Sequence, residues 1–345
     1  MSNYMEEMGK KAKIASRKLL TIDSKTKNNA LLKIADELIY KKEEIKDVNK
    51  IDIKNGKEAG LSFALLDRLE LTDSRIEAMA QSLREMAVFS DPIGEIVSGW
   101  RHKNGISIEK KRVPLGVIGM IYESRPNVTI DSAGLALKSS NAVILRGSSN
   151  AINSNIFLNK LFNEAGRKAG LPDNSVQLIE STDRDMVKEM ITLDKYIDVL
   201  IPRGGKGLKK FIIENATIPV IETGAGVCHV FVDESAKIDM ALPIIENAKI
   251  QRPSTCNSIE TVLIHRNVAK NIMLRLTDML IKDKVELFVR NSDITSNDDE
   301  FFTTLSGVST PISKKGNKYT YSDGTIKEKD YVTNPKKSGY SAYHI

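Results

Sequence analysis

The fold of this chain is decided by residues 112–147, which read RVPLGVIGMIYESRPNVTIDSAGLALKSSNAVILRG. Two apolar runs, VPLGVIGMIYE at 113–123 and AVILRG at 142–147, have the composition of buried strands, and we expect a helix near 130–139 between them. Strands that are apolar along their length are covered on both faces, as in a parallel sheet. The stretch therefore predicts a strand-helix-strand unit of an α/β fold with a doubly wound parallel sheet.

The same alternation continues along the chain. We expect further strands in SVQLIES (175–181), IDVLIPRGG (197–205) and IPVIETG (218–224). We expect helices between the strands at 151–169, 184–193 and 206–215. After Gly226, a second α/β pattern runs through CHVFVD (228–233), a helix near 236–250 and SIETVLIH (258–265). The pattern thus predicts a second α/β domain after the first.

The residues before 112 show two other patterns. Residues 3–90 have apolar side chains at spacings of three to four, which predicts amphipathic helices. In the segment 71–89, Thr72 or Asp73 suits the N-cap of such a helix. Residues 95–112 change to a strand pattern around Asn104-Gly105, which predicts a β-hairpin with a tight turn, because both positions accept a positive φ. The edges of such a hairpin need a cover or a partner chain.

The charge of the chain is concentrated near its end. The 345 residues carry a formal net charge of +6, and seven lysines against three acids in residues 311–345 supply +4 of it. A nucleic-acid-binding protein would instead carry its basic surface on a folded domain. A lysine-rich stretch with little aliphatic content predicts a poorly ordered tail. Nucleic-acid binding by this tail is the most distant alternative.

The composition excludes several classes of protein. Two cysteines cannot form a disulfide framework, so we expect a reducing, cytoplasmic location. No apolar run approaches a membrane span, and the first residues lack the apolar core of a secretory signal. The four histidines show no ligand spacing with cysteines or acids, so we expect no metal site.

Two glycine-containing loops are candidates for a nucleotide site. Each follows a predicted strand, one at Arg146-Gly147 and the other at Gly204-Gly205. Helix N-termini and close backbone approach at the carboxyl edge of a parallel sheet favour phosphate groups. Neither loop is a recognised dinucleotide or phosphate-loop motif, so an ordinary glycine turn remains the alternative for each. Two such loops at the same edge of one sheet favour a dinucleotide site more strongly than either loop does by itself.

Cys256, in QRPSTCNSIET, is the candidate nucleophile. A single cysteine is usually a small buried residue, but here the neighbours are polar and the segment joins a predicted helix to a strand. A nucleophilic thiolate needs stabilisation, for which Arg252 is a candidate cation. Cys228 lies inside a strand pattern, and we interpret it as a packed core thiol.

Two further polar residues follow predicted strands. Asn127, after Arg125-Pro126, could donate its amide to a developing oxyanion, or it could satisfy the backbone of a turn. Glu222 lies where a predicted strand runs into a glycine-rich turn. It could be a base or a cofactor contact, or a solvated carboxylate at a strand end.

Taken together, four segments resemble the aldehyde dehydrogenase superfamily. More narrowly, they resemble its glutamate-5-semialdehyde dehydrogenase branch, also called the γ-glutamyl phosphate reductases. The combination of ESRPNVT, QRPS-x-CN and G-x-CH-x-(F/Y)-V is specific to this branch. The likeness covers roughly residues 5–290 and is carried by the stretches 112–147, 201–208, 218–233 and 250–265.

The resemblance implies a role for each matching residue. In the family pattern, Cys256 is the nucleophile and Asn127 is the residue whose side-chain amide donates to the oxyanion. Glu222 is a possible base. Arg146, Gly147 and Ser148 match the adenosine side of an NADPH/NADP site, and Gly204 and Gly205 match the loop near the pyrophosphate. Arg125 and Arg252 are assigned to substrate binding. The implied reaction is reduction of L-glutamyl 5-phosphate by NADPH, through a cysteine thioester, with release of phosphate in proline biosynthesis.

The resemblance also implies an organisation into parts. We expect a cofactor domain from 1–94 and 113–224, an oligomerisation hairpin at 95–112, a partial catalytic domain at 225–310 and an atypical tail at 311–345. Residues 291–345 lack the histidine-containing and glycine-rich stretches of the family. The alternative is therefore a truncated, inactive relative that binds at most a nucleotide or a partner.

The partners that the resemblance implies are few. The small-molecule substrate is L-glutamyl 5-phosphate, and a functional link to glutamate 5-kinase follows from it. A homo-oligomer is expected to be weakened by the missing C-terminal part. We expect neither a nucleic-acid nor a membrane partner.

Overall fold

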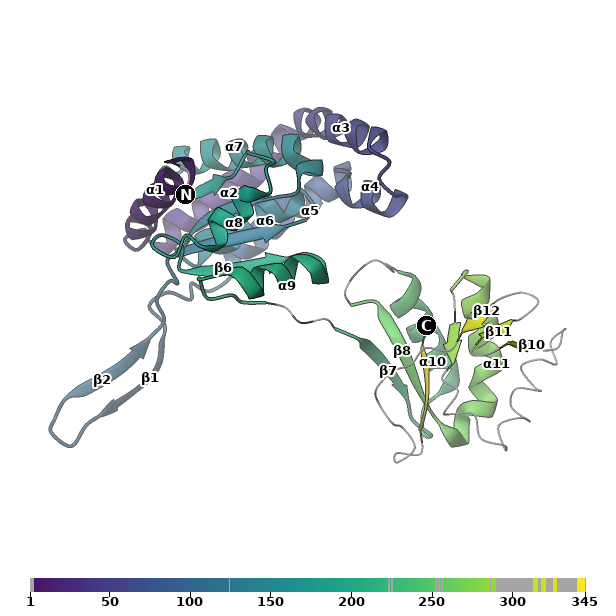
Figure 1. The fold of residues 1–345 in the computed structure, drawn as a ribbon. Coiled ribbons are helices and arrows are strands. Elements are labelled where there is room, and N and C mark those ends of the chain that lie inside the picture. The colour runs from purple at the N-terminus through teal and green to yellow at the C-terminus, as the bar shows by residue number, and fades with distance from the viewer. Residues whose placement is uncertain are drawn as a thin grey trace. The chain divides into compact units, whose positions relative to one another are not determined.

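The chain divides into two compact units, Met1–Thr223 and Gly224–Ile345 (Figure 1). Each unit is built around a hydrophobic core of its own. No helix in the described part of the chain is both long and apolar enough to cross a bilayer. The computed structural model describes residues 3–123, 125–222, 224, 226–251, 253, 255, 257–285, 287–289, 313–315, 318–320, 325–327 and 340–344.

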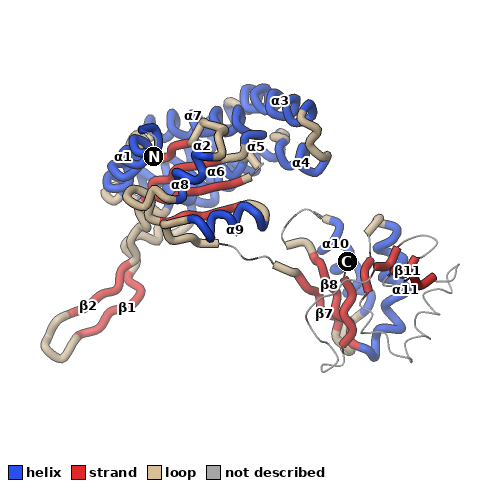
Figure 2. The backbone as a smooth tube through the Cα atoms, in the orientation of Figure 1, coloured by secondary structure: helices blue, strands red, loops and turns tan. Residues whose placement is uncertain are grey.

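The first unit begins with helices, as the sequence predicts. Asp23 caps the second helix by accepting a hydrogen bond from the Thr26 N–H at 2.7 Å, and Thr72 caps the fifth by accepting from the Arg75 N–H at 3.3 Å. Figure 2 shows this part of the chain as blue helices that precede the hairpin. The helices are α1 (Asn3–Leu19), α2 (Ser24–Tyr40), α3 (Lys42–Glu58), α4 (Phe63–Leu69) and α5 (Asp73–Val88).

The predicted hairpin is present and extends away from the rest of its unit (Figure 1). Strands β1 (Ile96–Arg101) and β2 (Ser107–Lys111) pair in antiparallel fashion, and every residue of β1 is exposed. At the turn, Gly105 has a φ of +89°, whereas Asn104 does not take a positive φ. The turn therefore needs glycine at one of the two predicted positions only. The role of the hairpin in oligomerisation stays a prediction.

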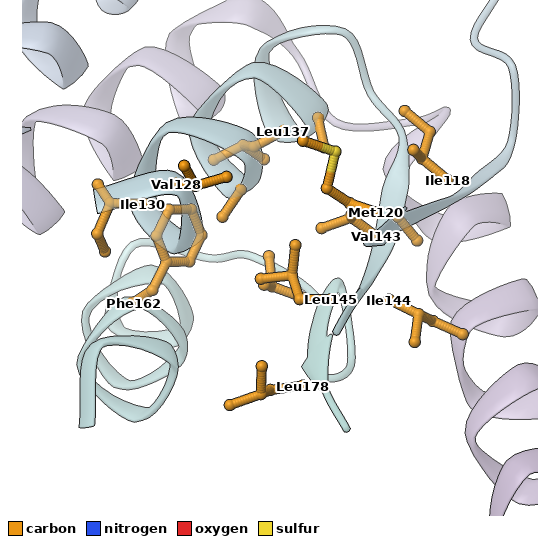
Figure 3. Close-up of a cluster of buried hydrophobic side chains, with 14 of the residues drawn as sticks. Ile118, Met120, Val128, Ile130, Leu137, Val143, Ile144, Leu145, Phe162 and Leu178 are labelled. Carbon is orange, nitrogen blue, oxygen red and sulfur yellow. The ribbon is translucent and has the colours of Figure 1, made fainter. Parts of the chain in front are cut away.

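The core of the first unit is a parallel sheet in the order β5-β4-β3-β6, which confirms the α/β fold. Val143 and Leu145 face Phe162, whereas Ile144 points to the other side of the sheet, where an N-terminal helix lies (Figure 3). Side chains on both faces of the sheet are thus buried. The strands are β3 (Val117–Tyr122), β4 (Ala142–Arg146), β5 (Val176–Leu178) and β6 (Val199–Arg203). The connecting helices are α6 (Asn127–Lys138), the short 3₁₀ turn η1 (Ser149–Ala151), α7 (Ile152–Lys168), α8 (Asp185–Ile191) and α9 (Lys206–Asn215).

The full strand predicted at 218–224 is wrong. The described residues there form a single parallel bridge between Val220 and Leu200 of β6. The Leu200 N–H donates to the Pro219 carbonyl at 2.9 Å, and the Ile221 N–H donates to the Leu200 carbonyl at 2.8 Å. Pro219 has no N–H of its own, so it cannot donate to a longer ladder. The segment therefore borders β6 without forming a regular strand.

The second unit is a mixed sheet in the order β10-β11-β12-β9-β13-β8-β7. Its first strands are parallel and joined by a helix, as predicted, whereas β13 runs antiparallel to β8 and β9. The prediction of a poorly ordered tail stays a prediction, because most of 311–345 lies outside the described residues. The larger elements are β7 (Cys228–Val232), α10 (Ile238–Ile250), β8 (Ile259–His265) and α11 (Arg266–Lys282). The shorter strands are β9 (Leu287–Val289), β10 (Ser313–Lys315), β11 (Lys318–Thr320), β12 (Thr325–Lys327) and β13 (Tyr340–His344).

A buried lysine ties the helices of the first unit to the start of the hairpin. Lys27 Nζ lies 2.6 Å from Asp91 Oδ2 and donates to Ser140 Oγ at 2.9 Å, and the Lys27 side chain is 2% exposed. Burial acts to raise the pKa of Asp91, but hydrogen bonds from Lys27, Ser24 and the Ile93 N–H outweigh it and hold that pKa below its usual range. The contribution of Asp91 to stability is therefore present near neutral pH and is lost as the pH falls through this lowered pKa.

Replacing Lys27 with methionine should destabilise the first unit. The substitution leaves the mostly buried Asp91 carboxylate without its cation, and breaking a buried pair in this way lowers the free energy of unfolding by about 3 kcal/mol or more. Urea denaturation followed by circular dichroism measures this loss.

The matched control is Lys50→Met, which removes an exposed ion pair with Asp47 at 2.7 Å. We expect that variant to change the free energy of unfolding by less than about 0.5 kcal/mol. Equal losses in the two variants would contradict the role given to the buried pair.

Candidate active site

The loops that follow β3, β4 and β6 begin at one edge of the parallel sheet. In the strand register, Arg146 lies opposite Ile121, and Arg203 lies opposite Tyr122. The carboxyl ends of these strands are therefore level with one another. The structure brings together at this edge the predicted residues Asn127, Arg146, Gly147, Ser148, Gly204 and Gly205.

The backbone at Gly147 lies so close to the buried Asn155 amide that only glycine fits at this position. A Cβ atom at this position would lie 2.2 Å from Asn155 Nδ2 and 3.1 Å from the ring of Tyr122. Asn155 is fully buried, and its Oδ1 accepts from Thr129 Oγ1 at 3.0 Å. Because Thr129 has one hydroxyl proton, the Tyr122 hydroxyl donates to Thr129 Oγ1, at 2.6 Å. The backbone of the loop after β4 thus rests on a polar cluster that leaves no room for a side chain.

Arg146 lies beside a second cation at this edge. Its Nη1 donates to the Gly147 carbonyl at 3.0 Å and its Nη2 to the Thr182 carbonyl at 3.5 Å. Its buried Nε has no hydrogen-bond partner among the residues that the structure describes. Burial lowers the pKa of Arg146, and the nearby charge of Arg184 lowers it further. Both effects disfavour the cation, and an anionic group bound here would offset both. Arg184, which lies in the loop before α8, was not among the predicted site residues.

Ser148 fixes the start of the same loop. Its Oγ accepts from the Asn150 N–H at 3.2 Å and caps the short turn η1. The side chain is partly buried. Ser148 therefore shapes the loop that follows Arg146 and leads into α7.

The glycine loop after β6 lies against Glu123, which the sequence analysis also missed. A Cβ atom on Gly204 would lie 2.8 Å from Glu123 Cδ, and one on Gly205 would lie 3.7 Å from Glu123 Oε1. The Glu123 N–H donates to the Arg203 carbonyl at 3.2 Å, which holds the start of this loop beside the end of β3. Gly205 is the N-cap of α9 and provides no side-chain cap. The glycine loop before α9 thus lies beside the exposed carboxylate of Glu123.

Asn127 is the first residue of α6 and not a turn residue. Its Nδ2 donates to Asp131 Oδ2 at 2.9 Å, one helical turn further on. Burial raises the pKa of Asp131, and Asn127, Arg203 and Ser82 act in the opposite direction. The spacing of four residues is visible in the sequence, but Asp131 was not among the predicted site residues.

The remaining predicted residues are less completely described. The Arg125 N–H donates to the Glu123 carbonyl at 2.6 Å, and its side chain is partly buried. Glu222 is exposed and lies two residues after the bridge at Val220. Cys256 and Arg252 lie outside the described residues, so their roles stay predictions.

Cys228 occupies the first position of β7 in the second unit. It is partly buried, so the interpretation of a fully packed core thiol is wrong. Near the predicted nucleophile, the Ser258 N–H donates to the Thr255 carbonyl at 3.2 Å. Lys249 Nζ in α10 donates to the Ile259 carbonyl at 3.1 Å, and burial lowers the pKa of Lys249. The first bond joins two residues on either side of position 256, and the second ties α10 to the start of β8.

The family model and the curated relatives that match this chain indicate the same protein family. A family model described as the aldehyde dehydrogenase family matches residues 2–330. The γ-glutamyl phosphate reductase of Campylobacter curvus is 58% identical over 300 residues, which cover 87% of this chain and 67% of that protein. The chain thus spans about two thirds of the length of this curated relative.

Solved structures agree with the sequence matches. The γ-glutamyl phosphate reductase of Thermotoga maritima is similar with a TM-score of 0.79 and 40% identity, covering 94% of this chain and 76% of that one. An engineered glycolyl-CoA reductase with bound NADP⁺ shares the fold with a TM-score of 0.60 and 20% identity, covering 79% of this chain and 59% of that one.

Replacing Gly147 with alanine should disturb the loop after β4. The added methyl group would overlap Asn155 Nδ2, which is buried and cannot move into solvent. Overpacking of this kind lowers the free energy of unfolding by about 1–3 kcal/mol. Chemical denaturation measures the change.

Gly207→Ala is the matched control, because a Cβ atom at that position in α9 meets nothing within 4 Å. Alanine favours a helix over glycine by up to about 1 kcal/mol, so this variant should be unchanged or more stable. A Gly147→Ala protein as stable as Gly207→Ala would show that the close approach does not constrain the loop.

Proposed function

The chain belongs to the aldehyde dehydrogenase family, and from this we propose that it reduces L-glutamyl 5-phosphate to L-glutamate 5-semialdehyde with NADPH and releases phosphate. The observation that carries the proposal is the 58% identity over 300 residues to the γ-glutamyl phosphate reductase of Campylobacter curvus. Family membership makes the chain an oxidoreductase of the aldehyde dehydrogenase type. The identity of the acyl phosphate rests on the names of the relatives.

The proposed chemistry proceeds through Cys256. Its thiolate attacks the acyl carbon, the C–O bond to phosphate breaks, and phosphate leaves with the electron pair. The product is a thioester, whose carbon accepts hydride more readily than a carboxylate carbon. NADPH supplies that hydride when it is bound. Collapse of the resulting thiohemiacetal breaks the C–S bond, restores the thiolate and releases the aldehyde.

Residues at the edge of the first sheet suit the cofactor. Arg146 and the nearby Arg184 favour an anion such as the 2′-phosphate of NADPH, and the buried Nε of Arg146 finds no partner in the described part of the chain. Ser148 and Gly147 line the same loop, and Gly204 and Gly205 give backbone access near the start of α9 for the pyrophosphate. These residues would therefore hold the adenosine side and the phosphates of the cofactor.

The remaining roles follow from the family pattern. Asn127 would donate an amide N–H to the oxyanion that forms during attack and collapse. Arg125 and Arg252 would bind the acidic substrate, and Glu222 would act as a base or contact the cofactor. A reductase of an acyl phosphate has less need of a base that activates water, so cofactor contact is the simpler role for Glu222.

The proposed reaction also implies a cellular setting. It belongs to proline biosynthesis in the cytoplasm and uses the product of glutamate 5-kinase. Among the described strands, β1 and β2 pair only with each other, so the outer edges of this exposed hairpin would pair with another subunit of a homo-oligomer.

Cys256→Ala should abolish the reaction. Loss of a covalent nucleophile lowers kcat by about a thousandfold or more. The assay follows NADPH oxidation, or phosphate-dependent NADP⁺ reduction by glutamate 5-semialdehyde, which avoids the unstable acyl phosphate. The partly buried Cys228 gives the control variant Cys228→Ala, which should retain turnover. Turnover by Cys256→Ala close to that of Cys228→Ala would reject the thioester route.

NADP⁺ binding should stabilise the protein even if turnover is absent. At about 100 times its Kd, a ligand of the native state adds about 2.7 kcal/mol to the free energy of unfolding.

Arg146→Gln should weaken NADP⁺ binding about tenfold while changing NAD⁺ binding little, because it removes a cation facing the 2′-phosphate. Thermal shift titrations of both nucleotides measure this.

The control for that titration is Arg167→Gln, in the last turn of α7, which should leave both affinities unchanged. Equal weakening of NADP⁺ and NAD⁺ by Arg146→Gln would contradict the 2′-phosphate assignment. Nucleotide binding without reduction of the substrate would favour the alternative of an inactive nucleotide-binding relative.

A further inference from the structure

Asp131 lies one helical turn after the proposed oxyanion donor and contacts it directly. Asn127 Nδ2 donates to Asp131 Oδ2 at 2.9 Å along the same face of α6. Asp131 is partly buried, whereas carboxylates are usually exposed unless they are paired. A carboxylate at this position thus has the Asn127 amide as a close partner.

The surroundings of Asp131 hold its carboxylate in place from two other elements. Ser82 in α5 hydrogen-bonds to it, and the charge of Arg203 at the end of β6 favours its ionised form. Burial raises the pKa of Asp131 above its usual range, and these two groups and the Asn127 amide oppose that rise. The carboxylate is therefore fixed by α5, by β6 and by its own helix.

An asparagine side chain needs such a partner if it is to act as a donor. Its oxygen and nitrogen ends are nearly equal in size, so packing alone does not decide which end faces a reacting atom. An ionised carboxylate accepts hydrogen bonds and donates none. Beside Asp131, the amide must present its nitrogen, and the second N–H of that nitrogen stays fixed in the amide plane.

We infer that Asp131 is a positioning residue that holds the Asn127 amide with its nitrogen oriented for oxyanion stabilisation. The inference rests on the proposed reductase function, in which Asn127 is the donor. Oxyanion donors act best when they are oriented before charge develops, because no reorganisation is then needed during the reaction. Asp131 contributes to the reaction by removing the alternative orientation of the amide.

A double-mutant cycle on kcat tests the inference. Asn127→Ala should lower kcat about 100-fold, as loss of an oxyanion donor does. Asp131→Asn should lower kcat about tenfold with little change in KM, because the neutral amide accepts either end of Asn127. In the double variant, the loss should equal that of Asn127→Ala alone, since Asp131 acts only through that side chain.

A matched control comes from α5. Gln81 Nε2 donates to Glu85 Oε1 at 3.1 Å with the same spacing of four residues, on an exposed face. Glu85→Gln should leave kcat unchanged. Two results would overturn the inference and indicate a general structural effect. One is a kcat loss in the Asn127→Ala/Asp131→Asn variant that equals the product of the two single losses. The other is a kcat loss in Glu85→Gln as large as that in Asp131→Asn.

The side-chain amide signals of Asn127 give a readout that needs no turnover. In ¹⁵N-labelled full-length protein, they are assigned by their loss in Asn127→Ala. They should shift as Asp131 is protonated at acidic pH, and this shift should vanish in Asp131→Asn. Signals that do not respond to pH or to the substitution would overturn the inference even if the enzyme is active.

The same readout separates this inference from the proposed function. A pH-dependent Asn127 signal in a chain without reductase activity would support the positioning and reject the reaction. If Asp131→Asn fails to fold, Ser82→Ala keeps the carboxylate and removes one of its hydrogen bonds. A smaller fall in kcat with a shifted Asn127 signal then supports the inference, and an unchanged signal overturns it.

Discussion

Hydrogen bonds from the central strand β3 to β4 and β6 set the level at which the loops after these three strands begin. They place Arg146 opposite Ile121 and Arg203 opposite Tyr122, so the loops after all three strands start at one edge. The ladder requires close packing behind it. A Cβ atom on Gly119 of β3 would lie 2.6 Å from Leu200 and 3.0 Å from Met190 of α8. A slip of one residue would turn the buried side chains of β3 toward the wrong helices and separate the loops.

Charged side chains of both signs lie at this edge. After β4 and β5, the charge of Arg184 disfavours the cationic form of Arg146, and a bound anion would offset that effect. Glu123 and Asp131 lie toward β6 and α6, close to Gly204 and Asn127. The charge of Arg203 at the end of β6 acts on Asp131, so a cation lies on this side of the edge as well.

Much of the fold could be predicted from local sequence patterns. The β3-α6-β4 unit and the hairpin follow from short-range periodicity and glycine placement, both of which can be read from neighbouring residues. The strand at 218–224 was not predicted correctly, because apolar composition outweighed the missing N–H of Pro219.

Contacts between distant residues were not accessible from the sequence. The Lys27–Asp91 pair and the Gly147–Asn155 approach form only when the elements pack. Of the candidate site, the loops and Asn127 were predicted from motifs and family resemblance. Glu123 and Arg184 were missed because their neighbours at this edge come from other elements of the chain. The spacing of four residues between Asn127 and Asp131 was visible, but it becomes a contact only because both residues lie in α6.

In the proposed reaction, Cys256 forms a thioester with the acyl group of the substrate before hydride transfer. Mass spectrometry of the protein mixed with L-glutamyl 5-phosphate in the absence of NADPH detects such a thioester. We expect a γ-glutamyl adduct on the peptide that contains Cys256, and this adduct should disappear when NADPH is added and aldehyde forms. Aldehyde formation with Cys256 unmodified throughout, or an adduct on another residue, would reject the thioester route.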